Sequence, residues 1–206
     1  DTLEGGAGND TLTGSTGNDT YMISDATDTI VEVKGAGLDT VQSWIDFELH
    51  LNSNNNALEN LVLLGSGDID GTGNLANNVI WGNSGKNKIS GSSGNDTIHG
   101  GAGEDDISGN LGNDHYYGGE GVDTINLLQG SDRVFYTSVL DAGDVLESFY
   151  TSGGGQDYVM LDGLFDSLGV AAADRVGRVS FVQNASQAQV WVDTDGVGGA
   201  DLMICR

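Results

Sequence analysis

The amino-acid sequence predicts an all-β fold: a right-handed parallel β-roll, a flattened solenoid of short strands and tight turns, followed by a β-rich C-terminal cap. Three observations predict it. A large apolar residue recurs every nine residues, glycine recurs in the same register, and the 206-residue chain contains 34 Gly and no Pro. Glycine is thus more than twice as frequent as its average of about 7% in proteins, which favours a fold rich in tight turns.

The nine-residue repeat is uninterrupted from residue 73 to residue 135. This stretch reads GNLANNVIW, GNSGKNKIS, GSSGNDTIH, GGAGEDDIS, GNLGNDHYY, GGEGVDTIN and LLQGSDRVF, and residues 5–31 read GGAGNDTLT, GSTGNDTYM and ISDATDTIV in the same frame. Such a fixed period indicates a repeat architecture. The eighth position always holds a large apolar residue: Leu12, Tyr21, Ile30, Ile80, Ile89, Ile98, Ile107, Tyr116, Ile125 and Val134.

Each position of the repeat has a structural reason. Glycine at the first, second and fourth positions permits positive φ and a close approach of neighbouring backbones, so this half forms a turn. The last residues alternate polar and apolar, as they do from Asp96 to His99, which predicts a very short strand with Ile98 pointing inward. Two such units form one coil of 18 residues, and the apolar residues of successive coils stack into a thin core.

The sixth position of the repeat is Asp or Asn throughout, and stacked coils place these residues above one another at intervals of 18. Like charges in successive coils repel unless a cation lies between them. Carboxylate and carbonyl oxygens are the ligands that Ca²⁺ prefers, so the pattern predicts several Ca²⁺ ions in the stacked turns. The pairs are Asp1 with Asp19, Asp10 with Asp28, Asp96 with Asp114, Asp105 with Asp123 and Asp114 with Asp132, and two pairs with one charge fewer are Asn78 with Asp96 and Asn87 with Asp105.

The composition excludes several classes of protein. With 7 basic and 31 acidic residues, the formal net charge is −24, so phosphate repels the chain, and we expect neither nucleic acid nor an anionic membrane surface as a partner. A single Cys and three scattered His exclude a disulfide scaffold and a Cys/His zinc site. No apolar run is long enough for a membrane span. No catalytic motif or paired-carboxylate cleft emerges, so we expect no catalytic residues and no enzymatic activity in this chain, although a larger parent protein could be an enzyme.

The consensus GGxGxDxUx resembles the RTX, or hemolysin-type calcium-binding, repeat of proteins exported by bacterial type I secretion. The resemblance implies a calcium-loaded β-roll in which backbone carbonyls of the first four positions and the sixth-position side chains of two successive coils hold each ion. The metal-site residues that it implies are Asp1, Gly5, Gly6, Gly8, Asp10, Gly14, Gly17, Asp19, Asp28, Asn78, Gly82, Gly85, Asn87, Gly91, Ser93, Gly94, Asp96, Gly100, Gly101, Gly103, Asp105, Gly109, Gly112, Asp114, Gly118, Gly119, Gly121, Asp123, Gly130 and Asp132.

The repeats divide the chain into four parts. Residues 1–42 form a first RTX block that starts at a sixth position, from which we expect the sequence to be a piece of a longer protein; within it, KGAGLDTVQ is a displaced repeat whose Asp39 supports the block. Residues 43–72 are linking coils without calcium, and residues 73–135 are the main nonapeptide array. Residues 136–206 resemble the C-terminal cap and secretion region of RTX proteins, with one degenerate repeat at Asp157, short helical turns at 161–169 and 170–177, and strands near 179–183, 188–193 and 202–205.

These features favour a calcium-dependent folding and secretion module at the C-terminal part of a larger secreted RTX protein, such as an adhesin, a toxin or a hydrolase. Its partners would be calcium and, in transit, the type I secretion machinery, and its location would be extracellular or on the bacterial cell surface. The alternative is an accessory polysaccharide-binding module of an extracellular carbohydrate-active enzyme. Outward-facing Thr97, His99, His115 and Tyr117 motivate that alternative.

Overall fold

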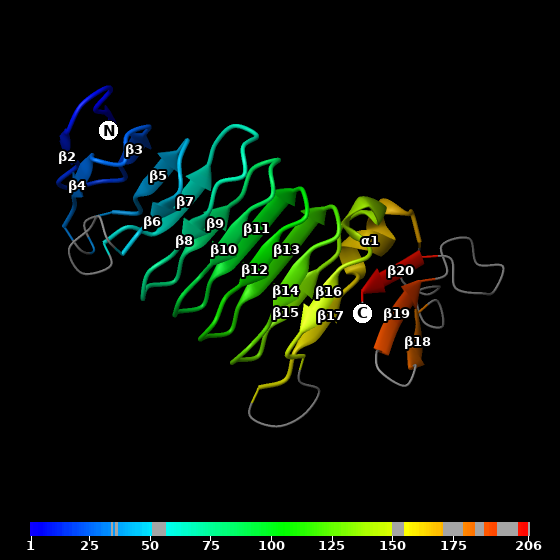
Figure 1. Ribbon diagram of the computed structural model, residues 1–206. Coiled ribbons are helices and arrows are strands. Elements are labelled where there is room, and N and C mark those ends of the chain that lie inside the picture. The colour runs from blue at the N-terminus through cyan, green and yellow to red at the C-terminus, as the bar shows by residue number, and fades with distance from the viewer. Residues whose placement is uncertain are drawn as a thin grey trace.

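Parallel β-strands stack along one axis and form the two faces of a solenoid (Figure 1). The computed structural model describes residues 1–33, 35, 37–50, 57–149, 155–170, 179–183, 188–192 and 202–205. One face is a continuous nine-stranded sheet, made of β1 (Thr2–Glu4), β3 (Thr20–Ile23), β5 (Thr40–Ser43), β7 (Asn60–Leu63), β9 (Val79–Trp81), β11 (Thr97–Ala102), β13 (His115–Glu120), β15 (Arg133–Phe135) and β17 (Tyr158–Met160).

The opposite face is divided into two sheets. A two-stranded sheet holds β2 (Thr11–Thr13) and β4 (Thr29–Val31), and a six-stranded sheet holds β6 (Phe47–Glu48), β8 (Gly71–Thr72), β10 (Lys88–Ser90), β12 (Asp106–Ser108), β14 (Thr124–Asn126) and β16 (Val145–Glu147). All these pairings are parallel. Strands therefore alternate between the faces along the chain, which confirms the parallel β-roll that the sequence predicts.

The register of the strands follows the repeat. Ile98 on β11 pairs with Tyr116 on β13, and Ile107 on β12 pairs with Ile125 on β14, a shift of one 18-residue coil. Where the repeat drifts, the coils are longer: Thr40 pairs with Asn60, a shift of 20 residues. The extra residues lie in the turns, so the strands keep their alignment while the sequence loses its period.

The core is the line of apolar eighth-position side chains between the faces. All ten of the residues predicted to point inward are buried, from Leu12 to Val134, and Ile98 and Ile125 are fully inaccessible. Leu58, Leu61 and Leu49 continue the same core through the linking coils. The thin core of a roll therefore arises from one apolar residue per half-coil.

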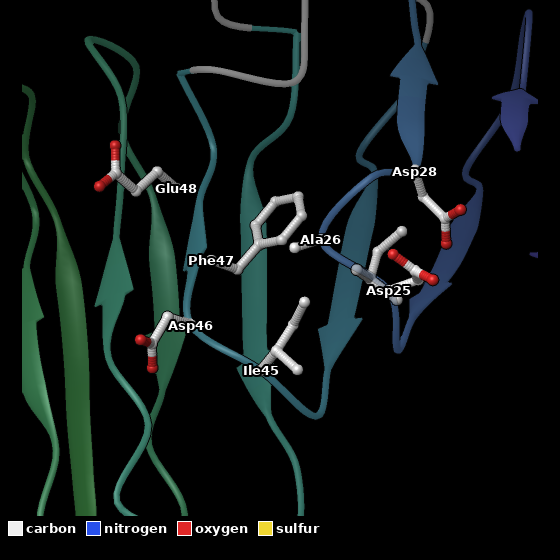
Figure 2. Close-up of a pocket in the computed structure, with 8 residues that line it drawn as sticks. Asp25, Ala26, Asp28, Ile45, Asp46, Phe47 and Glu48 are labelled. Carbon is white, nitrogen blue, oxygen red and sulfur yellow. The ribbon is translucent and has the colours of Figure 1, made fainter. Parts of the chain in front are cut away.

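The divided face has a gap between β4 and β6. Figure 2 shows Ile45 and Phe47 beside this gap, with Asp25 and Asp28 across it. These residues line a cavity of about 200 Å³ together with Ile23, Ala26, Asp46 and Glu48. On this face, no strand pairing links the first block to the rest of the roll in the described residues.

The C-terminal part leaves the roll and packs at its end (Figure 1). A 3₁₀-helix, η1 (Val139–Asp141), precedes β16, and α1 (Asp162–Ser167) follows β17, in agreement with the helical turn that the sequence predicts at 161–169. An antiparallel sheet of β18 (Val179–Gln183), β19 (Ala188–Val192) and β20 (Leu202–Cys205) confirms the three strands predicted there; a second helical turn predicted at 170–177 lies largely outside the described residues. Within the described chain, no helix is both long and apolar enough to cross a membrane.

Candidate metal centre

The sixth-position carboxylates form a ladder of hydrogen bonds along each edge of the roll. In each step, the backbone N–H of one residue donates to Oδ1 of the carboxylate one coil later. The N–H of Asp96 donates to Asp114 and that of Asp114 to Asp132, both at 2.8 Å, and on the other edge the N–H of Asp105 donates to Asp123 at 2.8 Å. The spacing of 18 residues therefore stacks the pairs that the sequence predicts.

The ladder at the edge that precedes the nine-stranded sheet runs almost the whole length of the roll. Its members in chain order are Asp1, Asp19, Asp39, Glu59, Asn78, Asp96, Asp114, Asp132 and Asp157, and each consecutive pair except Glu59 with Asn78 is joined by a main-chain N to carboxylate contact. The other edge has two segments, Asp10 with Asp28, and Asn87, Asp105, Asp123 and Asp144.

The second carboxylate oxygen of these residues has the properties of a metal ligand. It is buried and accepts no hydrogen bond in Asp10, Asp19, Asp28, Asp39, Asp96, Asp105, Asp123 and Asp132. An unpaired buried oxygen that carries charge costs several kcal/mol, on the order of the cost of burying an ion, so it calls for a cation. Since the donors are all oxygens, the residues fit Ca²⁺ rather than a transition metal.

Backbone carbonyls complete the oxygen-rich turns. A Cβ placed on Gly112, which has a φ of 143°, would overlap the carbonyl oxygen of Gly94 one coil earlier, and the same holds for Gly130, with a φ of 146°, over Gly112. Only glycine lets the turns approach so closely while holding this conformation. The stacked carbonyls of the fourth position lie beside the carboxylates that the repeats supply.

Burial changes the protonation of the ladder. Desolvation raises the pKa of Asp96 to about 8, and the neighbouring Asp114 carboxylate adds to the shift. Desolvation likewise raises the pKa of Asp105 and Asp132 to about 7 and that of Asp144 to about 8. A cation bound at these carboxylates opposes this effect, because it favours their charged form and competes with protons.

The two Asn members are joined to the preceding coil through their amide nitrogens. Nδ2 of Asn78 donates to the carbonyls of Leu58 and Glu59, at 3.3 and 3.1 Å, and Nδ2 of Asn87 donates to the carbonyl of Ile69 at 2.7 Å. An amide can donate and a carboxylate cannot. The two Asn side chains therefore connect these coils directly. Their amide nitrogen donates a hydrogen bond at the place where an Asp would have its second carboxylate oxygen.

Two coils of the interrupted edge carry apolar residues at the ladder position. The register aligns Phe47 with Gly71 and Gly71 with Ile89, which places Ile45 and Ile69 level with Asn87. Both isoleucines are partly buried and pack against the core. Their side chains offer no oxygen ligand at this edge, whereas Glu59 joins the ladder at the other edge, and the absence of calcium from residues 43–72 stays a prediction.

Side chains at the fifth position of the repeat form a second ladder of hydrogen bonds, in which the later coil donates to the earlier one. The backbone N–H of Asn113 donates to Oδ1 of Asn95 at 2.8 Å, and that of Ser131 donates to Oδ1 of Asn113 at 2.7 Å. Here the side chain of the earlier coil accepts from the later one. Consecutive turns are thus held by both an exposed amide contact and a buried carboxylate contact.

The structure adds ligand candidates that the repeat frame did not include. Glu59 and Asp144 accept from Asp39 and Asp123 at 2.9 and 3.0 Å, as regular ladder members do. Each stands two residues before a leucine, Leu61 or Leu146, which is a weak form of the D-x-U signal. They come 20 and 21 residues after their partners. Asp39 and Asp157, in displaced repeats, join the ladder as well.

The predicted glycines lie in the turns with one difference. Strands β11 and β13 continue through the first three positions of the following repeat, so that Gly101 pairs with Gly119 in the sheet. Ser93, at a third position, forms an isolated parallel bridge with Leu111. Several turns are therefore more strand-like than the sequence predicts, because the double glycine leaves room for the neighbouring coil.

The repeats match a known protein family. The family model of the RTX calcium-binding nonapeptide repeat matches in four copies, over residues 1–30, 72–107, 81–116 and 108–136. These copies cover residues 1–30 of the first block and the whole main array, including most of both ladders. Among curated proteins, none matches the chain.

Proposed function

From the premise that residues 1–30 and 72–136 are RTX calcium-binding repeats, we propose that this chain is a calcium-dependent folding and secretion module in the C-terminal part of a larger secreted protein. The observation that carries the proposal is the ladder of buried carboxylates, each with one oxygen bonded to the neighbouring coil and several with the other oxygen unpaired. When bound, Ca²⁺ supplies the positive charge that these oxygens lack.

Calcium binding and folding are the same equilibrium in such a chain. The sites combine residues of two coils, so no site exists before the coils stack, and the free energy of binding becomes free energy of folding. Without a cation, a net charge of −24 opposes compaction. The thin core, with one apolar residue in each half-coil, offsets only part of this repulsion.

This coupling suits export of an unfolded chain. In a cytosol with little free calcium the repeats stay unfolded, and they fold where calcium is abundant. Type I secretion, which the resemblance to RTX proteins implies, needs such a delay. The parent protein supplies the activity, and we assign no catalytic step to this chain.

Circular dichroism with and without a chelator tests the proposal. We expect the β-sheet signal of the full chain to appear on titration with calcium and to disappear in excess EDTA. Trp81 is 47% exposed on β9, so its fluorescence reports the main array during the same titration. A β-sheet signal that persists unchanged in EDTA at neutral pH would contradict the proposal.

A second candidate function, binding of a polysaccharide, is favoured by an aromatic row on the outer side of the nine-stranded sheet. The row consists of Trp81, His99, Tyr117 and Phe135, one from each of four adjacent strands, with centroids 3.6, 4.4 and 4.7 Å apart and planes within 10°. Aromatic side chains commonly bind ligands through their faces.

The geometry of the row limits this role. Because the rings stack on one another, neighbouring rings cover most of their faces. The register places Val62 beside Trp81 at one end of the row and Met160 beside Phe135 at the other. Stabilisation of the sheet by contacts between rings on neighbouring strands is therefore enough to explain the stack. Calorimetry of the calcium-loaded protein with neutral and acidic glycans decides the matter: binding that Trp81→Ala abolishes supports the second candidate, and the absence of heat with every glycan removes it.

A further inference from the structure

Glu32 departs from the repeat in a way that brings a third carboxylate to one turn. It follows β4 and stands where a repeat usually has its first glycine, yet it is only 4% exposed. Its Oε1 accepts from the N–H of Val33 at 2.7 Å, and its Oε2 accepts from the hydroxyl of Tyr21. The carboxylate is therefore turned into the roll and held in one orientation.

Glu32 meets two members of the ladder inside the first block. One carboxylate oxygen each of Asp19, Glu32 and Asp39 lies within 4.8 Å of the others. Asp19 is 2% exposed and Asp39 1%, and Oδ2 of each lacks a hydrogen-bond partner. The N-terminal ammonium of Asp1 forms an ion pair with Oδ1 of Asp19 at 2.7 Å, and among the described residues no Lys, Arg or His pairs with the three carboxylates.

Oxygen atoms of three side chains lie next to the backbone of Gly14. A Cβ placed on Gly14 would collide with Oδ2 of Asp19, Oε2 of Glu32 and the hydroxyl of Tyr21, so these groups converge on one point beside the backbone. At the equivalent first positions of the main array, the nearest atoms to an added Cβ belong to the carboxylate of the same repeat at Gly91, to Asp114 and the Tyr116 hydroxyl at Gly109, and to Asp123 and Asp144 at Gly118. In the described part of the chain, a group of three carboxylates with oxygens within 4.8 Å of one another occurs at Asp19, Glu32 and Asp39, in the first block.

We propose that Asp19, Glu32 and Asp39 form a three-carboxylate site for a hard divalent or trivalent cation, which binds here more tightly than at the two-carboxylate turns of the main array. The inference rests on the proposed function insofar as Ca²⁺ is the physiological ion. Affinity for Ca²⁺ rises with the number of charged oxygen ligands and with the rigidity of the site. Tyr21 acts as a positioning residue, because its hydroxyl fixes the orientation of Glu32.

Calorimetric titration of the full chain with Ca²⁺ tests the site. We expect wild type to show one site that fills before the rest, and Glu32→Gln to weaken that site about tenfold or more while the remaining sites keep their affinity. The matched control is Glu4→Gln, which removes one charge from an exposed residue of the same block and leaves the isotherm unchanged. Identical isotherms for Glu32→Gln and wild type overturn the inference.

Terbium luminescence provides a second arm of the test, which does not require the Glu32→Gln variant to fold. At one equivalent of Tb³⁺, we expect tyrosine-sensitised emission that Tyr21→Phe reduces severalfold and Tyr116→Phe leaves intact. Tyr116 is the matched control, since its hydroxyl lies 3.5 Å from Oδ2 of Asp114 in the main array. Emission that is lost in Tyr116→Phe instead shows that the main array fills first and overturns the inference.

The two arms separate this inference from the proposed function. If circular dichroism shows calcium-dependent folding but neither arm finds an early site in the first block, the inference fails and the function stands. If the chain is folded in EDTA yet binds Tb³⁺ first beside Tyr21, the function fails and the site stands.

Discussion

The backbone N–H of Asp114 donates to Oδ1 of Asp132 at 2.8 Å, while Oδ2 of Asp132 is buried without a hydrogen-bond partner. The two oxygens of one carboxylate thus have different roles: the first holds two coils in register, and the second is available to a cation. The same division recurs along both edges of the roll. It explains how a chain with so many carboxylates can stack them at intervals of 18 residues.

Asp114 contributes to two steps of one ladder, because it accepts from Asp96 and donates to Asp132. We expect Asp114→Asn to raise the calcium concentration at half-folding by about tenfold or more, since a tenfold change in affinity corresponds to only about 1.4 kcal/mol and two pairs each lose a charge. Calcium titration followed by circular dichroism measures the shift. Asp106→Asn, the same change at an exposed residue of β12, is the control, and an equal shift in both variants would contradict a ligand role for Asp114.

Gly112 is required for the close approach of successive turns. We expect Gly112→Ala to destabilise the calcium-loaded protein by about 1–3 kcal/mol, because the residue has a φ of 143° and its Cβ would overlap the carbonyl of Gly94. Thermal unfolding in saturating calcium measures the loss. Gly67→Ala is the matched control, since a Cβ there meets nothing within 4 Å, and we expect a change within about 0.5 kcal/mol.

The pH dependence of the calcium-free chain follows from the raised carboxylate pKa values. Burial raises the pKa of Asp96 to about 8 and that of Asp105 and Asp132 to about 7, from an ordinary value of 3.8. A group whose pKa is higher in the folded state stabilises the fold below its unfolded pKa and loses this contribution as pH rises through its folded pKa. Between about pH 4 and pH 8, acid therefore favours the folded state in EDTA.

Two measurements check this pH dependence. Circular dichroism in EDTA should show more β-structure at pH 5 than at pH 8. In calorimetry, the affinity of the folded roll for Ca²⁺ should be lower at pH 6 than at pH 8, because protons compete with Ca²⁺ for the same oxygens. A calcium-free chain that is equally unfolded at both pH values would show that protonated carboxylates do not stabilise the roll.

Substitution of Asn78 tests whether the hydrogen bonds of its side-chain amide take the place of a bound cation between two coils. Its Nδ2 donates to carbonyls of the preceding coil, so we expect Asn78→Asp to lose these bonds and to place a carboxylate beside them. The variant should need more calcium to fold and should bind one more ion than wild type in a calorimetric titration. An unchanged number of ions would show that the carbonyls of residues 58 and 59 cannot hold calcium with it. The control is Asn77→Asp, at an exposed fifth position.

The sequence predicts the roll and its core well, because both depend on a strict period. Ile98 and Ile107 are buried as their eighth positions require, and Asp96 stacks on Asp114 as the spacing of 18 requires. The three C-terminal strands also follow from local alternation. In each case a short pattern determines the structure without help from distant residues.

The sequence alone does not predict features that depend on coils of irregular length. Glu59 and Asp144 join the ladders at spacings of 20 and 21 residues, and extra residues in the turns absorb the difference. Glu32 occupies a glycine position of a decayed repeat, and only the fold shows that its carboxylate turns inward. Likewise, the side-chain amide of Asn87 donates a hydrogen bond to the carbonyl of Ile69, and the repeat pattern does not identify this acceptor.

The gap between β4 and β6 has a consequence for cooperativity. Ile45 and Phe47 line this gap. At the gap, the nine-stranded sheet continues through β5, whereas the opposite face has no pairing between β4 and β6. In a linear array, stability is a sum of unit terms and nearest-neighbour coupling terms, and the coupling across this junction is weaker than elsewhere. The N-terminal strands therefore form the unit that melts separately, and hydrogen exchange there should be faster than in β9 to β15.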